Sequence, residues 1–406
     1  MKRTKCDINE KTPRGGWPPI VLAASKGHTA VVGQLLDLGA DINAQVDRRQ
    51  DTGSFAEFDL ITFDGSSAIY LASHEGYAET LKYLIKRGAN VDQKKTNGST
   101  PIFGAAYRGH QEIVDILIDA GCDTCSPRPD GVTASSLAAQ EGHANILKSL
   151  VRGNADINIA RDDGATPVYM AARHGCVDTL GVLIDAGADV SVSMIGESEG
   201  ASPVYIAAQL GHTEALHMLI RAGANVNASI VTGFSPLFVA SQEGHLPVLR
   251  VLLNAGADVN FVNRKTRYCD APLTIAAYFG QIKAVALLLG AGADVSHVTA
   301  DDRTCESMLK DRHNAKLPEP SVEGIGWSPF RHHLFSSNHK KILMLMLRMC
   351  TLSSDKMIIS YQDEVSLAYR IPWVIWLETF YYTSGGWFSP KRTSAVTKKL
   401  LQKADN

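Results

Sequence analysis

Apolar residues along most of this chain recur at helical spacing, in short runs separated by polar stretches. The segment 29–38 carries four of them at positions i, i+1, i+4 and i+5, namely Val31, Val32, Leu35 and Leu36. This spacing places all four on one face of an α-helix. A shorter apolar run at 20–24 precedes it, and Gly39 follows where a left-handed residue would end the helix. The pattern predicts a pair of short helices.

The same two-helix pattern returns along the chain at a nearly fixed interval. The glycine after each first helix marks the copies, at Gly27, Gly76, Gly109, Gly142, Gly175, Gly211, Gly244 and Gly280. The steps from Gly76 to Gly175 are 33 residues each, the later ones are 36, 33 and 36, and the first is 49. A period near 33 residues indicates stacked helical repeats.

Motifs within the copies resemble those of ankyrin repeats. The triplets that stand where this family has Thr-Pro-Leu are Thr100-Pro101-Ile102, Thr166-Pro167-Val168 and Ser235-Pro236-Leu237. Gly-Ala-Asp/Asn-Val/Ile-Asn closes the units at 39–43, 223–227 and 256–260. The resemblance runs from about Gly16 to Asp311. It implies an all-α ankyrin-repeat solenoid of helix–turn–helix repeats with hairpin fingers, followed by a small helical C-terminal tail.

The repeat phase divides the chain into three regions. Residues 1–16 are polar and basic, and we expect a flexible N-terminal tail. Residues 17–317 are expected to hold eight full repeats and a degenerate cap, with an insertion at about 44–63 that lengthens one finger. Terminal repeats of such arrays are atypical and more polar. The phase is lost after Pro318, so residues 318–406 are expected to form a helical C-terminal extension.

Two expectations concern the starts of the first helices. Thr100 and Thr166 are suited to cap their helices, because each precedes a proline at the first helical position. The repeat at 130–155 departs from this pattern. It has Ala134 in place of the proline and Ser135-Ser136 in place of an apolar residue and a histidine. We therefore expect it to be the weakest of the middle repeats.

Composition narrows the class of protein and its surroundings. The chain has 406 residues, 45% of them hydrophobic and 20% charged, with a net charge of −2, which suits a folded protein without a general attraction to nucleic acid. The first residues lack the apolar region of a secretory signal, and no run of 18 apolar residues predicts a transmembrane segment. Seven irregularly spaced cysteines favour a reducing compartment, the cytoplasm or alternatively the nucleus.

Motifs that carry chemistry are absent or have simpler explanations. The chain contains no phosphate-binding glycine loop and no Gly-x-Ser-x-Gly motif, so we expect neither an enzyme nor a cofactor. Cys122 and Cys125 have a redox or zinc spacing, but no second pair exists and structural filler is the better interpretation. The one group of histidines off the repeat pattern is His332-His333 with His313 or His339, and it has no recognised ligand spacing, so no metal is expected.

Two sets of ring residues recur in register with the repeats. The resemblance implies structural hydrogen bonds for the Gly-His histidines, which are His28, His110, His143, His212 and His245. Aromatic residues replace the family's usual first-helix histidine at Tyr70, Phe103, Tyr169, Tyr205 and Phe238. Their spacing and buried-face position favour packing between repeats over a ligand-binding ladder.

The binding surface follows from the resemblance. Ankyrin proteins bind partners with a concave face made of the finger tips and the two variable residues after Ala-Ala. The candidate protein-binding residues are Lys94, Thr96, Asn97, Tyr107, Arg108, Gln140, Glu141, Arg173, His174, Gln209, Leu210, Gln242 and Glu243. We expect a monomeric, non-catalytic scaffold or adaptor for one or more proteins. The arginines beside Tyr107 suit an acidic or phosphorylated peptide, although Glu141 and Glu243 oppose it.

Two alternatives concern the C-terminal extension. The segment from Ile371 to Phe380 loosely resembles the start of an F-box, which would make the protein a substrate adaptor of a ubiquitin ligase. The aromatic residues Trp373, Trp376, Phe380 and Tyr381 could instead lay the tail on a membrane surface, as in a peripheral membrane adaptor.

Overall fold

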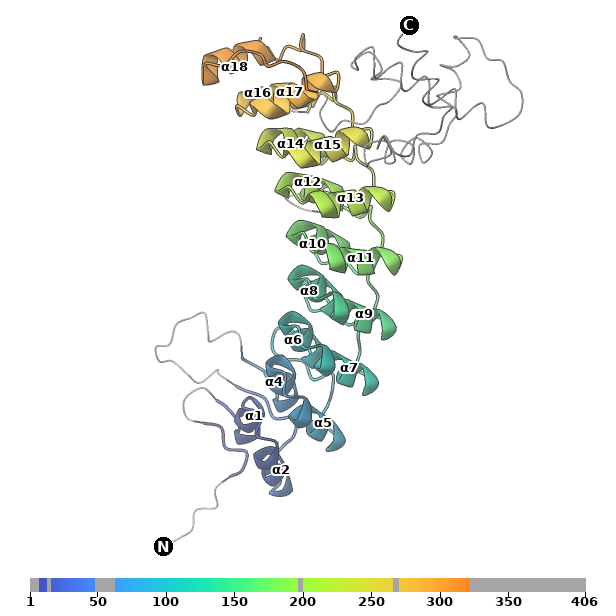
Figure 1. Cartoon of the computed structure of the whole chain (residues 1–406). Helices are drawn as coiled ribbons and strands as arrows, with labels where there is room; N and C mark the ends of the chain where they lie inside the picture. Colours follow the sequence, from blue (N-terminus) through green and yellow to red (C-terminus); the bar gives the residue numbers. More distant parts are fainter. Residues whose placement is uncertain (1–6, 13–15, 48–62, 196–199, 266–269, 322–406) are drawn as a thin grey trace, which may run out of the picture. The chain divides into compact units, whose positions relative to one another are not determined.

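The computed structural model describes residues 7–12, 16–47, 63–195, 200–265 and 270–321 (Figure 1). Seventeen α-helices and two isolated β-bridges make up the regular structure of this described part. The chain divides into two compact units, Met1–Ala240 and Ser241–Asn406, with the division inside helix α14. The all-α ankyrin-repeat solenoid predicted from the sequence is confirmed.

The first unit contains six helix pairs, one for each repeat (Figure 1). The pairs are α1 (Pro19–Ala24) with α2 (Thr29–Asp37), α4 (Ala68–Glu75) with α5 (Ala78–Lys86), α6 (Pro101–Arg108) with α7 (Gln111–Asp119), α8 (Ala134–Glu141) with α9 (Ala144–Arg152), α10 (Pro167–His174) with α11 (Val177–Asp185), and α12 (Pro203–Leu210) with α13 (Thr213–Arg221). Each first helix contacts the next first helix, and each second helix the next second helix. The unit is therefore two layers of helices joined by short turns.

The second unit has the same kind of helix pairs and ends in half a repeat. Its helices are the end of α14 (Pro236–Glu243), α15 (Leu246–Asn254), α16 (Pro272–Tyr278), α17 (Ile282–Gly290) and α18 (Cys305–His313). Helix α16 contacts both α17 and α18, while α15 contacts α17. No second helix follows α18 within the described residues, which end at Ser321.

Residue size explains why the two layers pack closely. The alanine pairs of the first helices, such as Ala105-Ala106 and Ala171-Ala172, are completely buried and let neighbouring backbones approach. The second helices after α2 each bury a leucine in the same register, for example Leu117 and Leu150. Burying such a side chain contributes about 2 kcal/mol.

The first repeat departs from the expected apolar face. Val31 and Leu22 are 43% and 46% exposed, so the apolar residues of both helices are only partly buried. Among the four apolar residues that the spacing places on one face of 29–38, Val32 alone is buried, while Leu35 and Leu36 are half-buried. The second helix α2 is less buried because it lies at the end of the layer. It contacts only one second helix, α5, whereas α5 contacts second helices on both sides.

The starts of the first helices only partly follow the expected caps. Thr166 accepts a hydrogen bond from the Tyr169 amide, as expected, but Thr100 caps nothing and its hydroxyl is buried without a partner. In α8, the Thr133 hydroxyl accepts from the Ser136 amide at 3.1 Å and the Ser136 hydroxyl accepts from the Thr133 amide at 3.0 Å. This capping box satisfies two donors. Ser136 thus compensates for the proline that this repeat lacks.

A ladder of side-chain hydrogen bonds links the ends of successive repeats in the first unit. Asn43 Oδ1 accepts from the amide of Asn90 at 3.0 Å, and Asp92 Oδ1 accepts from the amide of Asp123 at 2.9 Å. Residues 7–12 extend this ladder, because Asn9 Oδ1 accepts from the amide of Asp41 at 2.9 Å. The sequence assigns these residues to a flexible tail. In the structure they repeat the Asp-Ile-Asn turn of 41–43 and bond to it.

Several expectations fall on parts of the chain that the structure does not describe. The inner part of the insertion, residues 48–62, is one of them. The C-terminal extension beyond Ser321 is another, together with its F-box-like and membrane-lying interpretations. Within the described residues, no helix combines the length and apolar character needed to span a bilayer.

Candidate functional site

The last two residues of the first helices α4, α6, α8, α10, α12 and α14 lie outside the buried face, and each is exposed or half-buried. Tyr107 is 47% exposed, and Arg108, Glu141, Arg173 and His174 are exposed as well. These positions follow the buried alanine pair directly, so the same register that buries the alanines presents the next two side chains to solvent. The sequence predicted this arrangement. No described contact joins the side chains of Tyr107 and Arg173, so whether they act on one partner stays a prediction.

The glutamine–glutamate pairs form local hydrogen bonds. Gln140 Nε2 donates to Glu141 Oε1 at 2.9 Å, and Gln242 Nε2 donates to Glu243 Oε1 at the same distance in the second unit. Each carboxylate is thus partly satisfied by its own neighbour. Gln209 and Leu210, at the end of α12, are exposed.

The three candidate residues of the finger between α5 and α6 also shape that finger. Thr96 donates to Asp64 Oδ2 at 2.9 Å, and Asn97 Oδ1 accepts from the Ser99 amide at 3.1 Å. Lys94 Nζ donates to the Ser126 hydroxyl of the next finger at 3.3 Å. All three are exposed, so they remain available to a partner while holding the finger in shape.

His74 connects two neighbouring first helices through its imidazole. Its Nδ1 lies 2.9 Å from Glu75 Oε1, and its Nε2 accepts from Arg108 Nε at 3.1 Å. Burial, the largest cause, lowers the pKa of His74, and the Arg108 charge lowers it further although Glu75 opposes this. A neutral ring fits both contacts, because an arginine can only donate. In the sequence, His74 directly follows Ala72-Ser73, but nothing there marked it as the partner of Arg108.

A lysine lies against a buried aromatic ring next to this imidazole. Lys95 is only 7% exposed, and its Nζ lies 5.0 Å from the centre of the Tyr70 ring. Burial raises the pKa of Tyr70 to about 12, an effect that the charges of Arg128 and Arg108 oppose. Burial also lowers the pKa of Lys95, with Arg128 adding to the shift. Sequence reasoning missed Lys95, because a lysine in a finger is expected to be solvated.

The aromatic residues and most of the described Gly-His histidines have the structural roles predicted for them. Phe103, Tyr169 and Phe238 are buried, as are Tyr70 and Tyr205. The ring Nε2 atoms that bond to a carbonyl of the preceding repeat belong to His110, His143 and His212, which reach His74, Tyr107 and Arg173 respectively. His28 is exposed. His313, which the sequence left off this pattern, makes the same bond to Tyr278 at 3.0 Å.

The Cys122-x-x-Cys125 spacing is explained by the repeat, as predicted. Cys122 is buried where other repeats have alanine, and burial raises its pKa to about 12. Cys125 Sγ accepts from the Asp156 amide at 3.4 Å, the ladder position that asparagine fills elsewhere. Both thiols are free. Over the described residues no group of three or more potential ligands is arranged to hold a metal ion.

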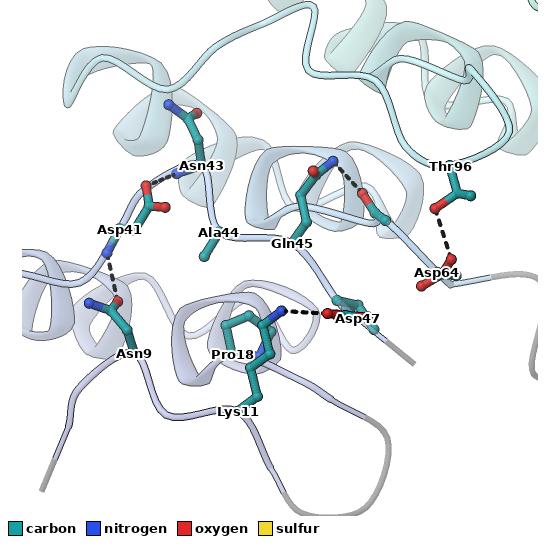
Figure 2. Close-up of a pocket in the computed structure, with 12 residues that line it drawn as sticks. Asn9, Lys11, Pro18, Asp41, Asn43, Ala44, Gln45, Asp47, Asp64 and Thr96 are labelled. Carbon is teal, nitrogen blue, oxygen red and sulfur yellow. Dashed lines mark hydrogen bonds and ion pairs between the residues drawn. The ribbon is translucent and has the colours of Figure 1, made fainter. Parts of the chain in front are cut away.

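A polar cavity of about 540 Å³ lies at the start of the array (Figure 2). Figure 2 shows Asn9 and Lys11 facing the turn at 41–47, with the Lys11 ammonium 3.4 Å from Asp47 Oδ2. Gln45 also lines the cavity, and its Nε2 donates to the carbonyls of Gly65 and Lys94 at 2.7 Å each. The polar groups around the cavity therefore join the N-terminal segment to the first two fingers.

Comparison with protein-family models agrees with this geometry. A model described as ankyrin repeats in three copies matches residues 50–128, 121–194 and 204–299. A model of many copies matches 169–220, and a single-repeat model matches 15–47. Ankyrin repeats are generally protein–protein interaction modules, and proteins built from them are typically non-catalytic. The matches cover more than half of the chain, and the protein belongs to the ankyrin repeat family.

Proposed function

We propose that this protein is a non-catalytic scaffold or adaptor that binds partner proteins through the ends of its first helices and the neighbouring fingers. The observation that supports this most is the row of exposed side chains at a constant register in the first unit, which includes Tyr107, Arg108, Arg173 and His174. Tyrosine and arginine are the residue types that most often dominate binding energy.

The construction of the array favours binding by preformed shape. The exposed pairs are fixed by buried alanines on one side and, at Tyr107 and Arg173, by histidine hydrogen bonds to their carbonyls on the other. A surface held in this way loses little conformational entropy when a partner binds. We also propose that the chain acts as a monomer in the cytoplasm, where the four free thiols of the described part would stay reduced.

The direct test changes Tyr107, Arg108, Arg173 and His174 together to alanine. A matched control changes four exposed residues of the second helices, Asn145, Lys148, His217 and Arg221, to alanine. Partners of the native chain and both variants are compared by quantitative affinity purification. The first variant should recover partners at least tenfold less, about 1.4 kcal/mol, and the control should match the native chain.

Both variants should keep native stability, because exposed substitutions change it by only about 0.5 kcal/mol each. If the first variant recovers every native partner normally, the recognition surface lies elsewhere. Light scattering of the purified chain tests the monomer, and a stable dimer would contradict it.

A further inference from the structure

Arg108 is held in a defined orientation at the end of α6. Its Nε donates to His74 Nε2 at 3.1 Å, and His74 in turn is fixed by the contact of its Nδ1 with Glu75 Oε1 at 2.9 Å. The His74 ring is also stacked on Tyr70, with 6.1 Å between ring centres and 18° between planes. The side chain of Arg108 is therefore positioned from the neighbouring repeat and not by its own helix alone.

This contact leaves the chemically useful edge of the guanidinium open. Arginine carries five N–H groups, and the Nε bond to His74 uses one of them. The two terminal nitrogens form the fork that binds carboxylate or phosphate through paired hydrogen bonds. None of the ion pairs between described residues involves Arg108, which is exposed.

Two further cations act on the same place. Lys95 lies over the Tyr70 ring, and the Arg128 charge acts on both Tyr70 and Lys95. Arg128 comes from the next finger, and its buried Nε has no hydrogen-bond partner among the described residues. The charges of Arg108 and Lys95 also act together on His74, so the three cations concentrate positive charge at this place.

The nearby carboxylates are each engaged by another group. Glu75 accepts from His74, Asp130 pairs with Arg128, and Asp64 accepts from Thr96 at 2.9 Å. They balance the formal charge of the cluster without covering the fork of Arg108. The exposed Tyr107 ring lies beside Arg108 in the chain and offers apolar contact area for the residues that flank an anion.

We propose that Arg108, with Lys95 and Arg128 behind it, recognises an anionic side chain, a carboxylate or a phosphate, of a segment in a protein partner. His74 is a positioning residue, because it orients Arg108 and need not touch the partner. The proposal rests on the proposed function and adds the chemistry of the partner to it.

The test uses the full chain and three fluorescein-labelled degenerate peptide libraries, with phosphoserine, glutamate or serine fixed at the centre. Fluorescence polarisation gives the apparent affinity for each. We expect at least one anionic library to bind tenfold or more tightly than the serine library. Preference for phosphoserine alone identifies a phosphate ligand, whereas similar affinity for glutamate identifies a carboxylate.

Substitutions then assign the preference to this site. R108K keeps the charge but loses the fork, and it should reduce the anionic preference at least tenfold, while the matched control R221K on α13 should not change it. H74A should reduce the affinity and H74Q should restore most of it, because the glutamine oxygen can accept from Arg108 Nε. Circular dichroism of each variant checks that the helices are retained.

Three results would overturn the proposal: equal affinity for all three libraries, absence of binding by all of them, or an unchanged preference in R108K. None of these would remove the proposed function, provided that the fourfold alanine variant still loses its partners. If that variant also binds normally, both proposals fail.

Discussion

At the scale of single residues, the position after each turn glycine shows what the fold requires. His110, His143 and His212 each contact a carbonyl of the preceding repeat. Cys176 and Gln281 fill the same position and reach the carbonyls of Gln140 and Gln242. In these five repeats the position holds a hydrogen-bond donor of suitable reach, and histidine is one solution among several.

The weakest of these bonds predicts a stabilising substitution. Cys176 Sγ lies 3.8 Å from the Gln140 carbonyl, compared with 3.2 Å for His143 Nε2 and the Tyr107 carbonyl. C176H should therefore raise the free energy of unfolding by about 1 kcal/mol, the net value of a typical hydrogen bond. Urea denaturation followed by circular dichroism measures it. The reciprocal change H143C should lose a similar amount, and a loss in both variants would contradict the interpretation.

The capping box of α8 gives a second prediction. T133A removes the acceptor of the Ser136 amide and should cost about 1 kcal/mol. T100A is the matched control, because the Thr100 hydroxyl caps nothing, and it should cost clearly less. Urea denaturation of both variants measures the difference. Equal losses would show that the box adds no stability.

His74 makes stability depend on pH in a defined direction. Burial lowers its pKa in the folded chain below the ordinary value of 6.5. As pH falls through about 6.5, the unfolded chain takes up the proton more readily than the folded chain, so stability decreases. Above that range the ring is neutral in both states and contributes nothing. H74Q should lose less stability than the native chain between neutral and mildly acidic pH, as measured by urea denaturation, and equal losses would contradict the assignment.

At the scale of elements, most of the fold could be predicted from the sequence because each position of the repeat recurs in several copies. A buried position therefore shows itself as the same residue type at a regular spacing. The alanine pairs, the leucines and the aromatic residues recur in register, so their burial followed from spacing. Lys95 and the partnership of His74 with Arg108 could not be predicted. They depend on side chains of two different repeats meeting at one place, and the period contains no information about such pairs.

Two glycines, one between α6 and α7 and one after α7, offer a test that separates packing from backbone conformation. Gly109 and Gly121 have φ angles of 84° and 79°, which cost an alanine about 1 kcal/mol at either site. A Cβ at Gly109 would lie 2.9 Å from His143 Cε1, whereas a Cβ at Gly121 would meet nothing within 4 Å. G109A should therefore lose about 1 kcal/mol more than G121A, since it also displaces the His143 hydrogen bond. Thermal and urea denaturation measure the gap, and equal losses would mean that the imidazole adapts freely.

At the scale of the whole chain, stability comes from interfaces between neighbouring repeats, so the ends matter most. At the first end, residues 7–12 extend the ladder of turns, because the Asp41 amide donates to Asn9 Oδ1, but they leave Leu22 and Val31 of α1 and α2 exposed. The sequence did not reveal this, because one Asp-Ile-Asn turn without its helices does not stand out as a repeat. At the other end of the described part, Ser321 lies beyond the boundary at 317 that the sequence predicts, and its amide donates to the Ala286 carbonyl at 2.8 Å.

That contact predicts where the array can be shortened. The backbone of Ser321 lies over Gly290, at the end of α17, in space that a larger residue would fill. Chains ending at 321 and at 317 should both fold into helical arrays, because each helix pair has its own neighbours. The shorter chain should lose about 1 kcal/mol of local stability in α17, since it lacks the Ser321 bond.

Hydrogen exchange measured by mass spectrometry should show α17 exchanging several-fold faster in the shorter chain, with α7 and α9 unchanged as internal controls. Equal exchange in α17 would mean that residues 318–321 lie on the array without stabilising it, and loss of helicity in both chains would mean that the array depends on residues beyond 321.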